Sequence, residues 1–383
     1  VGGGAFAAII GCFAPKFLDA NWTIGLPSWG GIQTASAGTF VGFILFMALT
    51  AWVAYNGLEN IKWVQNIGGP ILIAVMIGLL LWSYSYAHGA SGIGFWEVMK
   101  QPNDMTLINE KGGWAFVYLT GLMGNIAFWA TIALNIPDFS RYAKSNGSQF
   151  WGQMIGMPVP MAFCAFVGAY FAQATKLVDG TASFDPTTVF YYLDNKVVIF
   201  ISAIGVVMAT ITTCCAANVV APANGLSNVY PRKISYRGGV IITCLMAFFI
   251  LQAWWIYGSG SAYFTWMNAY GTILSPVAAI LVADYWIVKK QRIDIKALFV
   301  GDGRYAYSNG INWAAVISWF VAFILPLMLY FGVDNAFFTA INSINYIWSF
   351  VVGFVVYMLL MKTGLAGRSH VTEEEYAAMT KIE

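Results

Sequence analysis

The chain has 383 residues, of which 59% are hydrophobic and only 9% are charged. Soluble globular domains carry about 25% charged residues, so this composition, with a mean hydropathy of +0.68, excludes a soluble enzyme and indicates a polytopic membrane protein. The net charge of +2 is too small to indicate a nucleic-acid partner. The five cysteines lie in apolar segments without a C-x-x-C pair, which is typical of small buried residues and not of a metal site.

The first apolar segment, VGGGAFAAIIGCFA, is shorter than the roughly 20 residues that cross a bilayer. It begins at Val1 and lacks the basic region of a signal peptide. We therefore expect the second half of a helix whose beginning is missing, in an N-terminally truncated fragment. Its glycines are typical of a helix-packing face in lipid.

Nine further segments are long and apolar enough to span a membrane. We expect these spans at about 38–56, 68–87, 114–134, 152–174, 197–221, 238–257, 263–287, 311–332 and 341–361. The pattern predicts an all-α transmembrane domain over residues 1–362 and a short polar tail over 363–383, with the tail forming a frayed helix.

Lys and Arg gather in alternate loops, after the spans at 114–134, 197–221 and 263–287. Basic loops stay on the cytoplasmic side. The alternation therefore predicts a cytoplasmic C-terminus.

The sequence contains no Walker loop, no G-x-S-x-G or H-E-x-x-H motif and no arginine-rich span. A secondary transporter, a passive channel or a membrane-embedded enzyme remain. All 17 acidic residues fall in loops, in the tail or at span ends, with Asp138 and Asp284 nearest to a span. The spans thus offer no buried carboxylate for a proton relay or for catalysis, which disfavours an enzyme.

Polar residues interrupt one span in the stretch MATITTCCAANVVAPANG, residues 208–225. Ala209, Thr212 and Thr213 share one helix face. Their oxygens suit a hard cation, and without a carboxylate sodium is favoured over calcium or magnesium. The alternative is threonines that bond back to their own helix. Asn218 lies about 140° around the helix and about 7.5 Å along it. It either binds a polar substrate beside the ion or bonds to another helix.

Two aromatic residues, Phe128 and Trp129, lie deep in the span at 114–134. A tryptophan in mid-membrane is away from its usual interfacial belt. It either packs against neighbouring helices or offers a flat face on which a planar ring stacks.

Four stretches carry a resemblance to the nucleobase–cation symporter-1 family, which includes bacterial transporters for hydantoins, allantoin, cytosine and uracil. These are GLENIKWVQNIGGPIL (57–72), LNIPDFSRYAKS (134–145), AANVVAPANGLSNVYPRKIS (216–235) and SPVAAILVADYWIVKKQRID (275–294). The resemblance covers essentially the whole chain. It implies a twelve-helix transporter with a five-plus-five inverted repeat, in which the nine spans are helices four to twelve. The opening segment then ends helix three, while helices one and two are missing.

The resemblance also implies roles for individual residues. The family's sodium ligands correspond to the Ala209 carbonyl and the Thr212 and Thr213 hydroxyls, and its substrate-binding asparagine corresponds to Asn218. The tryptophan that stacks on the substrate corresponds to Trp129, or to Phe128 if the register is one residue off. One departure is Gly225, where relatives often have Asp.

The expected function is therefore sodium-driven import of a planar nucleobase-like or hydantoin- or allantoin-type heterocycle by a monomer in the bacterial inner membrane. No cofactor is expected beyond the coupling ion. Proton coupling, a passive channel and a non-functional fragment are the alternatives. Phe264, Trp266 and Leu274, in the span at 263–287, are expected to form an extracellular gate.

Overall fold

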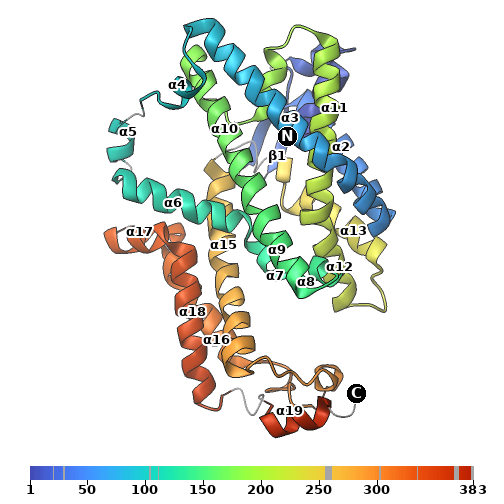
Figure 1. Ribbon diagram of the computed structural model, residues 1–383, viewed down its shortest axis with the longest axis vertical. Coiled ribbons are helices and arrows are strands. Elements are labelled where there is room, and N and C mark those ends of the chain that lie inside the picture. Colours follow the sequence, from blue (N-terminus) through green and yellow to red (C-terminus); the bar gives the residue numbers. More distant parts are fainter. Residues whose placement is uncertain are drawn as a thin grey trace. The chain divides into compact units, whose positions relative to one another are not determined.

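The computed structural model describes residues 1–19, 21–28, 31–102, 105–110, 112–254, 261–301, 303–333, 335–365 and 371–380. The chain forms two compact units (Figure 1). Unit 1 comprises residues 1–103 and 138–260, and unit 2 comprises residues 104–137 and 261–383.

Unit 1 is built mainly from helices. Its elements are α1 (Gly2–Gly11), η1 (Pro15–Leu18), β1 (Thr23–Ser28), β2 (Gly31–Ser36), α2 (Ala37–Tyr55), α3 (Leu58–Ser91), α4 (Phe95–Met99), α9 (Asn146–Gly156), α10 (Pro158–Asp179), η2 (Pro186–Tyr191), α11 (Lys196–Thr213), the π-helix η3 (Cys214–Val220), α12 (Ala221–Val229), α13 (Tyr236–Leu245) and the π-helix η4 (Met246–Ile250).

The described elements of unit 2 are all helical. They are α5 (Met105–Glu110), α6 (Gly113–Phe128), α7 (Ala130–Asn135), α15 (Ser261–Val282), the π-helix η5 (Ala283–Val288), η6 (Lys296–Phe299), α16 (Trp313–Leu327), η7 (Met328–Phe331), α17 (Ala336–Ser343), α18 (Asn345–Lys362) and α19 (Glu373–Thr380). The short helix α8 (Pro137–Ser140) lies where the chain passes from unit 2 into unit 1.

Eight helices of the described chain are long and apolar enough to cross a membrane. They cover Ala37–Tyr55, Glu59–Ser91, Gly113–Asn135, Asn146–Asp179, Lys196–Val229, Tyr263–Val288, Trp313–Phe331 and Asn345–Lys362. Each overlaps a span expected from the sequence, which confirms a multi-pass helical membrane protein.

The ninth expected span, 238–257, differs from its prediction. The described helix is the shorter segment Tyr236–Ile250. The backbone leaves helical geometry soon afterwards, because Gln252 has a φ of 49°, in the left-handed region. Residues 255–257 of the expected span lie outside the described residues.

A two-stranded antiparallel hairpin precedes α2 and was not expected in an all-α chain. Thr23 pairs with Ser36 and Ser28 pairs with Gly31. Gly31 has a φ of 94°, which glycine adopts readily. Ile24 and Leu26 alternate as strand residues do, but a pattern this short is not distinctive in a chain of long apolar segments.

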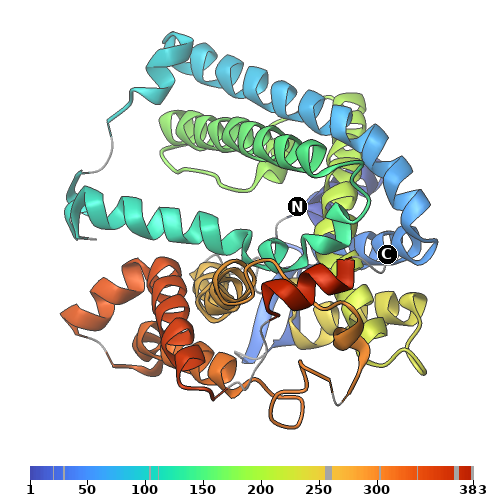
Figure 2. The same ribbon diagram turned by 60° about the horizontal axis from the view of Figure 1, so that its bottom comes forward.

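Unit 1 is held together by close contacts at glycines. The Gly3 backbone lies so near α2 that an added Cβ would be 2.9 Å from both the Phe43 nitrogen and the Thr39 oxygen. This confirms the prediction that the opening glycines form a packing face. Figures 1 and 2 both show α3 and α10 running side by side in this unit, and α11 packs against α3 as well.

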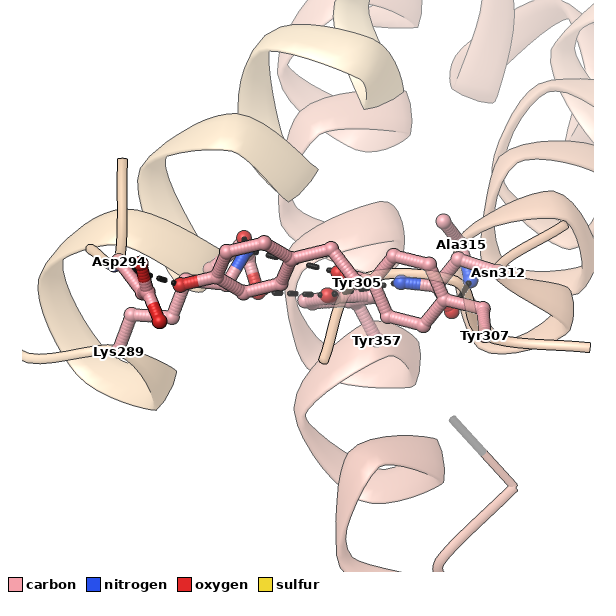
Figure 3. Close-up of polar contacts among 8 residues, drawn as sticks. Lys289, Asp294, Tyr305, Tyr307, Asn312, Ala315 and Tyr357 are labelled. Carbon is pink, nitrogen blue, oxygen red and sulfur yellow. Dashed lines mark hydrogen bonds and ion pairs between the residues drawn. The ribbon is translucent and has the colours of Figure 1, made fainter. Parts of the chain in front are cut away.

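Unit 2 packs around α15, α16 and α18, as Figure 1 shows. At the basic-loop end of these helices, a polar cluster joins all three (Figure 3). Lys289 Nζ lies 2.5 Å from Asp284 Oδ2, and the Tyr357 hydroxyl donates to Asp284 Oδ1 at 2.9 Å. Asn312 Nδ2 donates to the Tyr357 oxygen at 3.3 Å, while its Oδ1 caps α16.

Candidate functional site

Three oxygen atoms converge near the C-terminal end of α11. The Thr212 hydroxyl donates to the Ala209 carbonyl at 2.7 Å, and the Thr213 hydroxyl donates to the same carbonyl at 3.3 Å. This is the back-bonding expected of threonines in membrane helices. It also places a carbonyl and two hydroxyls together, and each hydroxyl has lone pairs that can face a cation once its proton turns aside.

A neighbouring threonine shows the contrast. Thr210 also bonds back, with its hydroxyl donating to the Val206 carbonyl at 2.7 Å, but this bond uses a different acceptor. Thr212 is 7% exposed, whereas Thr213 lies on the exposed side of the helix. The three predicted ion ligands are therefore brought together at a point that is covered on one side and open on the other.

Asn218 lies in the π-helix η3, which begins directly after Thr213. A π-helix bonds residue i to i+5, so the helix is wider and rotates less per residue than an α-helix. The expected angle of about 140° between Thr213 and Asn218 assumed regular α-helix and is wrong for this segment. Short π-helices occur frequently at functional sites.

The Asn218 side chain is exposed on unit 1. Among the described residues of this unit, no hydrogen bond joins it to another helix. Between substrate binding and an interhelical bond, the role of Asn218 stays a prediction. Its exposed amide contacts the Cys214 thiol within η3 and has further donor and acceptor positions.

Trp129 lies at a break in its span, which was not predicted from the sequence. α6 ends at Phe128 and α7 starts at Ala130, while Trp129 itself has φ −101° and ψ 3°. The sequence GNIAFWATIAL contains neither a proline nor a glycine at the break, so no local signal marks it. Broken helices are the sites where transporters commonly bind substrates.

The break is supported by α15. The Tyr270 hydroxyl donates to the Ala127 carbonyl at 2.8 Å, an oxygen that would otherwise accept from the helix that the break interrupts. Gly271 lets α15 approach closely, because a Cβ there would lie 2.5 Å from Ala127 Cβ. Phe128 is 47% exposed and meets Trp129 edge-on, with ring centroids 5.2 Å apart.

The three residues predicted to form a gate all lie on α15, but they differ in burial. Phe264 and Trp266 are exposed, and Leu274 is half-buried. Trp266 packs on Tyr270 with ring centroids 4.7 Å apart. Their role as a gate stays a prediction.

The two acids nearest to a span are both paired. Asp138 accepts from Asn224 Nδ2 at 3.1 Å, which connects two of the stretches that carried the family resemblance. Asp284 belongs to η5, within the last turns of its span, and its side chain is 19% exposed. The prediction that the spans contain no buried carboxylate therefore does not hold for Asp284, which is largely buried. Its charge is balanced by Lys289.

The family model for permeases of cytosine and purines, uracil, thiamine and allantoin matches residues 1–364. The chain belongs to the nucleobase–cation symporter-1 family.

Two curated relatives illustrate the range of this family. The chain is 31% identical to the purine-uracil permease NCS1 of Arabidopsis thaliana over 85% of its own length and 54% of the relative's. It is 28% identical to the allantoin permease of Bacillus subtilis over 93% of its own length and 72% of the relative's. The chain thus spans about half to three quarters of these permeases, and both are transporters, not enzymes.

Two solved structures show the same fold. One is the family transporter Mhp1 in a closed conformation with bromovinylhydantoin bound, with a TM-score of 0.66, 18% identity and coverage of 94% of this chain and 72% of that one. The other is inward-facing Mhp1, with a TM-score of 0.64, 19% identity and coverage of 98% and 74%. The predicted transporter fold is confirmed, while the six predicted site residues stay predictions.

Proposed function

We propose that this family member is a secondary active symporter that imports a planar nucleobase-like or hydantoin- or allantoin-type heterocycle, with sodium as the coupling ion. The observation that carries the proposal is the convergence of the Thr212 and Thr213 hydroxyls on the Ala209 carbonyl, at 2.7 and 3.3 Å. Neutral oxygens of this kind suit a hard monovalent cation.

In this proposal the ion binds to Ala209, Thr212 and Thr213, and Asn218 reads the amide edge of the substrate. Only the first four residues of the π-helix η3, from Cys214 to Ala217, separate Thr213 from Asn218. An ion held at Thr213 fixes the start of η3 and thereby the direction of Asn218. Sodium then favours the conformation that binds substrate, which is the differential affinity that coupling requires.

Trp129 is proposed to stack on the substrate ring, and this role rests on a separate observation in unit 2. Trp129 lies at the break between α6 and α7, and Tyr270 and Gly271 contact Ala127 beside this break. Phe128, adjacent and more exposed, is the alternative platform. The relatives named for purine, uracil and allantoin transport support a planar substrate.

The test is uptake of radiolabelled uracil, allantoin and hydantoin into proteoliposomes that contain the purified protein. We expect one of these compounds to accumulate above its external concentration when a sodium gradient is imposed, and not when choline replaces sodium. Accumulation driven by a pH gradient alone would instead show proton coupling. Equilibration without accumulation would show a passive channel. With no uptake under any gradient, the protein would not transport these substrates.

We further propose a monomer in the bacterial inner membrane with its C-terminus in the cytoplasm. The basic loop that contains Lys289, Lys290 and Arg292 and the tail both follow spans that end on the same predicted side. Labelling of single cysteines introduced into the tail, in intact and in permeabilised cells, distinguishes the two orientations.

A further inference from the structure

The ion-binding stretch of α11 touches α3 at a glycine. A Cβ added to Gly68 would overlap the Cγ2 methyl of Thr212 and would lie 3.3 Å from its Cβ and 3.4 Å from its Oγ1. The three nearest atoms to this position all belong to Thr212. The backbone of α3 therefore forms the wall against which one proposed ion ligand rests.

The next glycine along the chain behaves differently. A Cβ on Gly69 would meet nothing within 4 Å. About two turns further along the same helix pair, Gly205 on α11 makes the reciprocal contact, because its Cβ would lie 2.8 Å from Cγ2 of Val75 on α3. The two helices thus pack through one glycine from each side, and only the Gly68 contact reaches an oxygen ligand.

We propose that Gly68 is a positioning residue for the coupling ion, an inference that rests on the proposed sodium site. The methyl and the hydroxyl of Thr212 are attached to the same carbon, so pushing the methyl aside rotates the hydroxyl with it. A side chain at Gly68 therefore turns the Thr212 oxygen away from the Ala209 carbonyl, from which it is now 2.7 Å distant. In such a variant the Thr212 and Thr213 hydroxyls would no longer both lie against the Ala209 carbonyl.

The experiment measures sodium binding to the purified protein without any organic substrate. Thermal unfolding is followed as NaCl rises at constant ionic strength with choline chloride, because a ligand that binds only the folded state raises its stability with concentration. The sodium dependence yields an apparent Kd. The melting temperature without sodium reports packing alone.

We expect Gly68→Ala to raise the apparent sodium Kd roughly tenfold, which is the effect of a strained rotamer at one ligand. Two matched variants separate positioning from packing. Gly69→Ala should leave both the apparent sodium Kd and the melting temperature without sodium unchanged. Gly205→Ala should lower the melting temperature without sodium, because it crowds the same helix pair, but should leave the sodium Kd unchanged.

A double variant identifies the contact itself. Thr212→Ser removes the methyl and keeps the hydroxyl, so Gly68→Ala combined with Thr212→Ser should return the sodium Kd to that of Thr212→Ser alone. If Gly68→Ala does not accumulate in membranes, the double variant should accumulate and bind sodium with the Kd of Thr212→Ser. Failure of this rescue overturns the proposal, as does an equal Kd shift in Gly205→Ala or an unchanged Kd in Gly68→Ala.

Thr213→Ala separates this inference from the proposed function. If Thr213→Ala weakens sodium binding and Gly68→Ala does not, the ion site stands and the role of Gly68 is wrong. If neither Thr213→Ala nor Thr212→Ala changes sodium binding, the ion assignment itself is wrong, and the inference about Gly68 falls with it.

Discussion

At the scale of single residues, the Ala209 carbonyl distinguishes two kinds of membrane threonine. Thr212 and Thr213 both donate to it, while Thr210 donates to Val206. The sequence identified the spacing of these groups, because i, i+3 and i+4 fall on one face of any α-helix. It did not show that one acceptor is shared, since side-chain rotamers depend on neighbours such as Gly68 that are distant in the chain.

Asn218 leads to the first prediction. Replacing Asn218 with Ala removes both the donor and the acceptor that we propose for the amide edge of the substrate. Uptake of the preferred heterocycle in proteoliposomes should fall to background, while the sodium-dependent rise in melting temperature should remain. Wild-type uptake by this variant would remove Asn218 from the site.

Tyr270 leads to a second prediction, on stability. Tyr270→Phe removes the well-formed hydroxyl bond to the Ala127 carbonyl and leaves only the Trp129 backbone N–H directed at this oxygen. Loss of a buried hydrogen bond costs about 0.5–1.5 kcal/mol, so the melting temperature should fall. Tyr118→Phe, on the exposed side of α6, is the matched control and should have no effect. Equal stability of the two variants would mean that the break does not depend on Tyr270.

At the scale of helices, span positions were predictable and helix irregularities were not. Long apolar runs identify spans because every backbone polar group in lipid must be satisfied internally. The polar start of α3, from Leu58, carries no such signal, and the helix begins ten residues before its predicted start at 68. The π-helix that carries Asn218 and the break at Trp129 are set by packing between helices, which local sequence does not record.

The polar cluster of unit 2 supports the third prediction. The side chains of Lys289 and Asp284 are 10% and 19% exposed. Burial lowers the pKa of Lys289, but the bond to the Asp284 carboxylate outweighs this, and the pKa is raised overall. Lys289→Met leaves the covered carboxylate unpaired and should destabilise the protein by about 3–5 kcal/mol.

Thermal unfolding checks this prediction, with Lys290→Met as the control at an exposed neighbour. Adding Asp284→Asn to Lys289→Met should recover most of the loss, because no charge is then left without a partner. An equal loss in both lysine variants, or no recovery in the double variant, would contradict the account of this pair.

The tail helix α19 provides a prediction about pH. The Arg304 guanidinium lies 2.9 Å from Glu375, and this bond, with the Thr372 backbone N–H, lowers the pKa of the carboxyl to about 2. Because the folded pKa is depressed, the stabilisation is fully present above the ordinary pKa of 4.5 and is lost as the pH falls through about 2. A carboxyl-carbon NMR titration should show this value, and Arg304→Gln should return it towards 4.5. An ordinary pKa in the unaltered protein would show that the tail is not held by this pair.

At the scale of the whole molecule, the family and the fold could be predicted from the sequence because several separated stretches agree in type and order. The division into two compact units could not be predicted. Unit 2 takes residues 104–137 from the middle of the chain together with residues 261–383, and no change in composition marks these boundaries. The predicted substrate residues accordingly lie in different units, with Asn218 in unit 1 and Trp129 in unit 2.

We propose that the oxygens around Ala209 bind the ion that drives transport. The most direct measurement is the initial rate of heterocycle uptake into proteoliposomes as external sodium is varied, for the wild type, Thr213→Ala and Thr210→Ala. Both variants lose one back-bonded hydroxyl, but only Thr213 shares the Ala209 acceptor. We expect Thr213→Ala to need roughly tenfold more sodium for half-maximal uptake and Thr210→Ala to match the wild type. The same sodium dependence in all three proteins would contradict the claim.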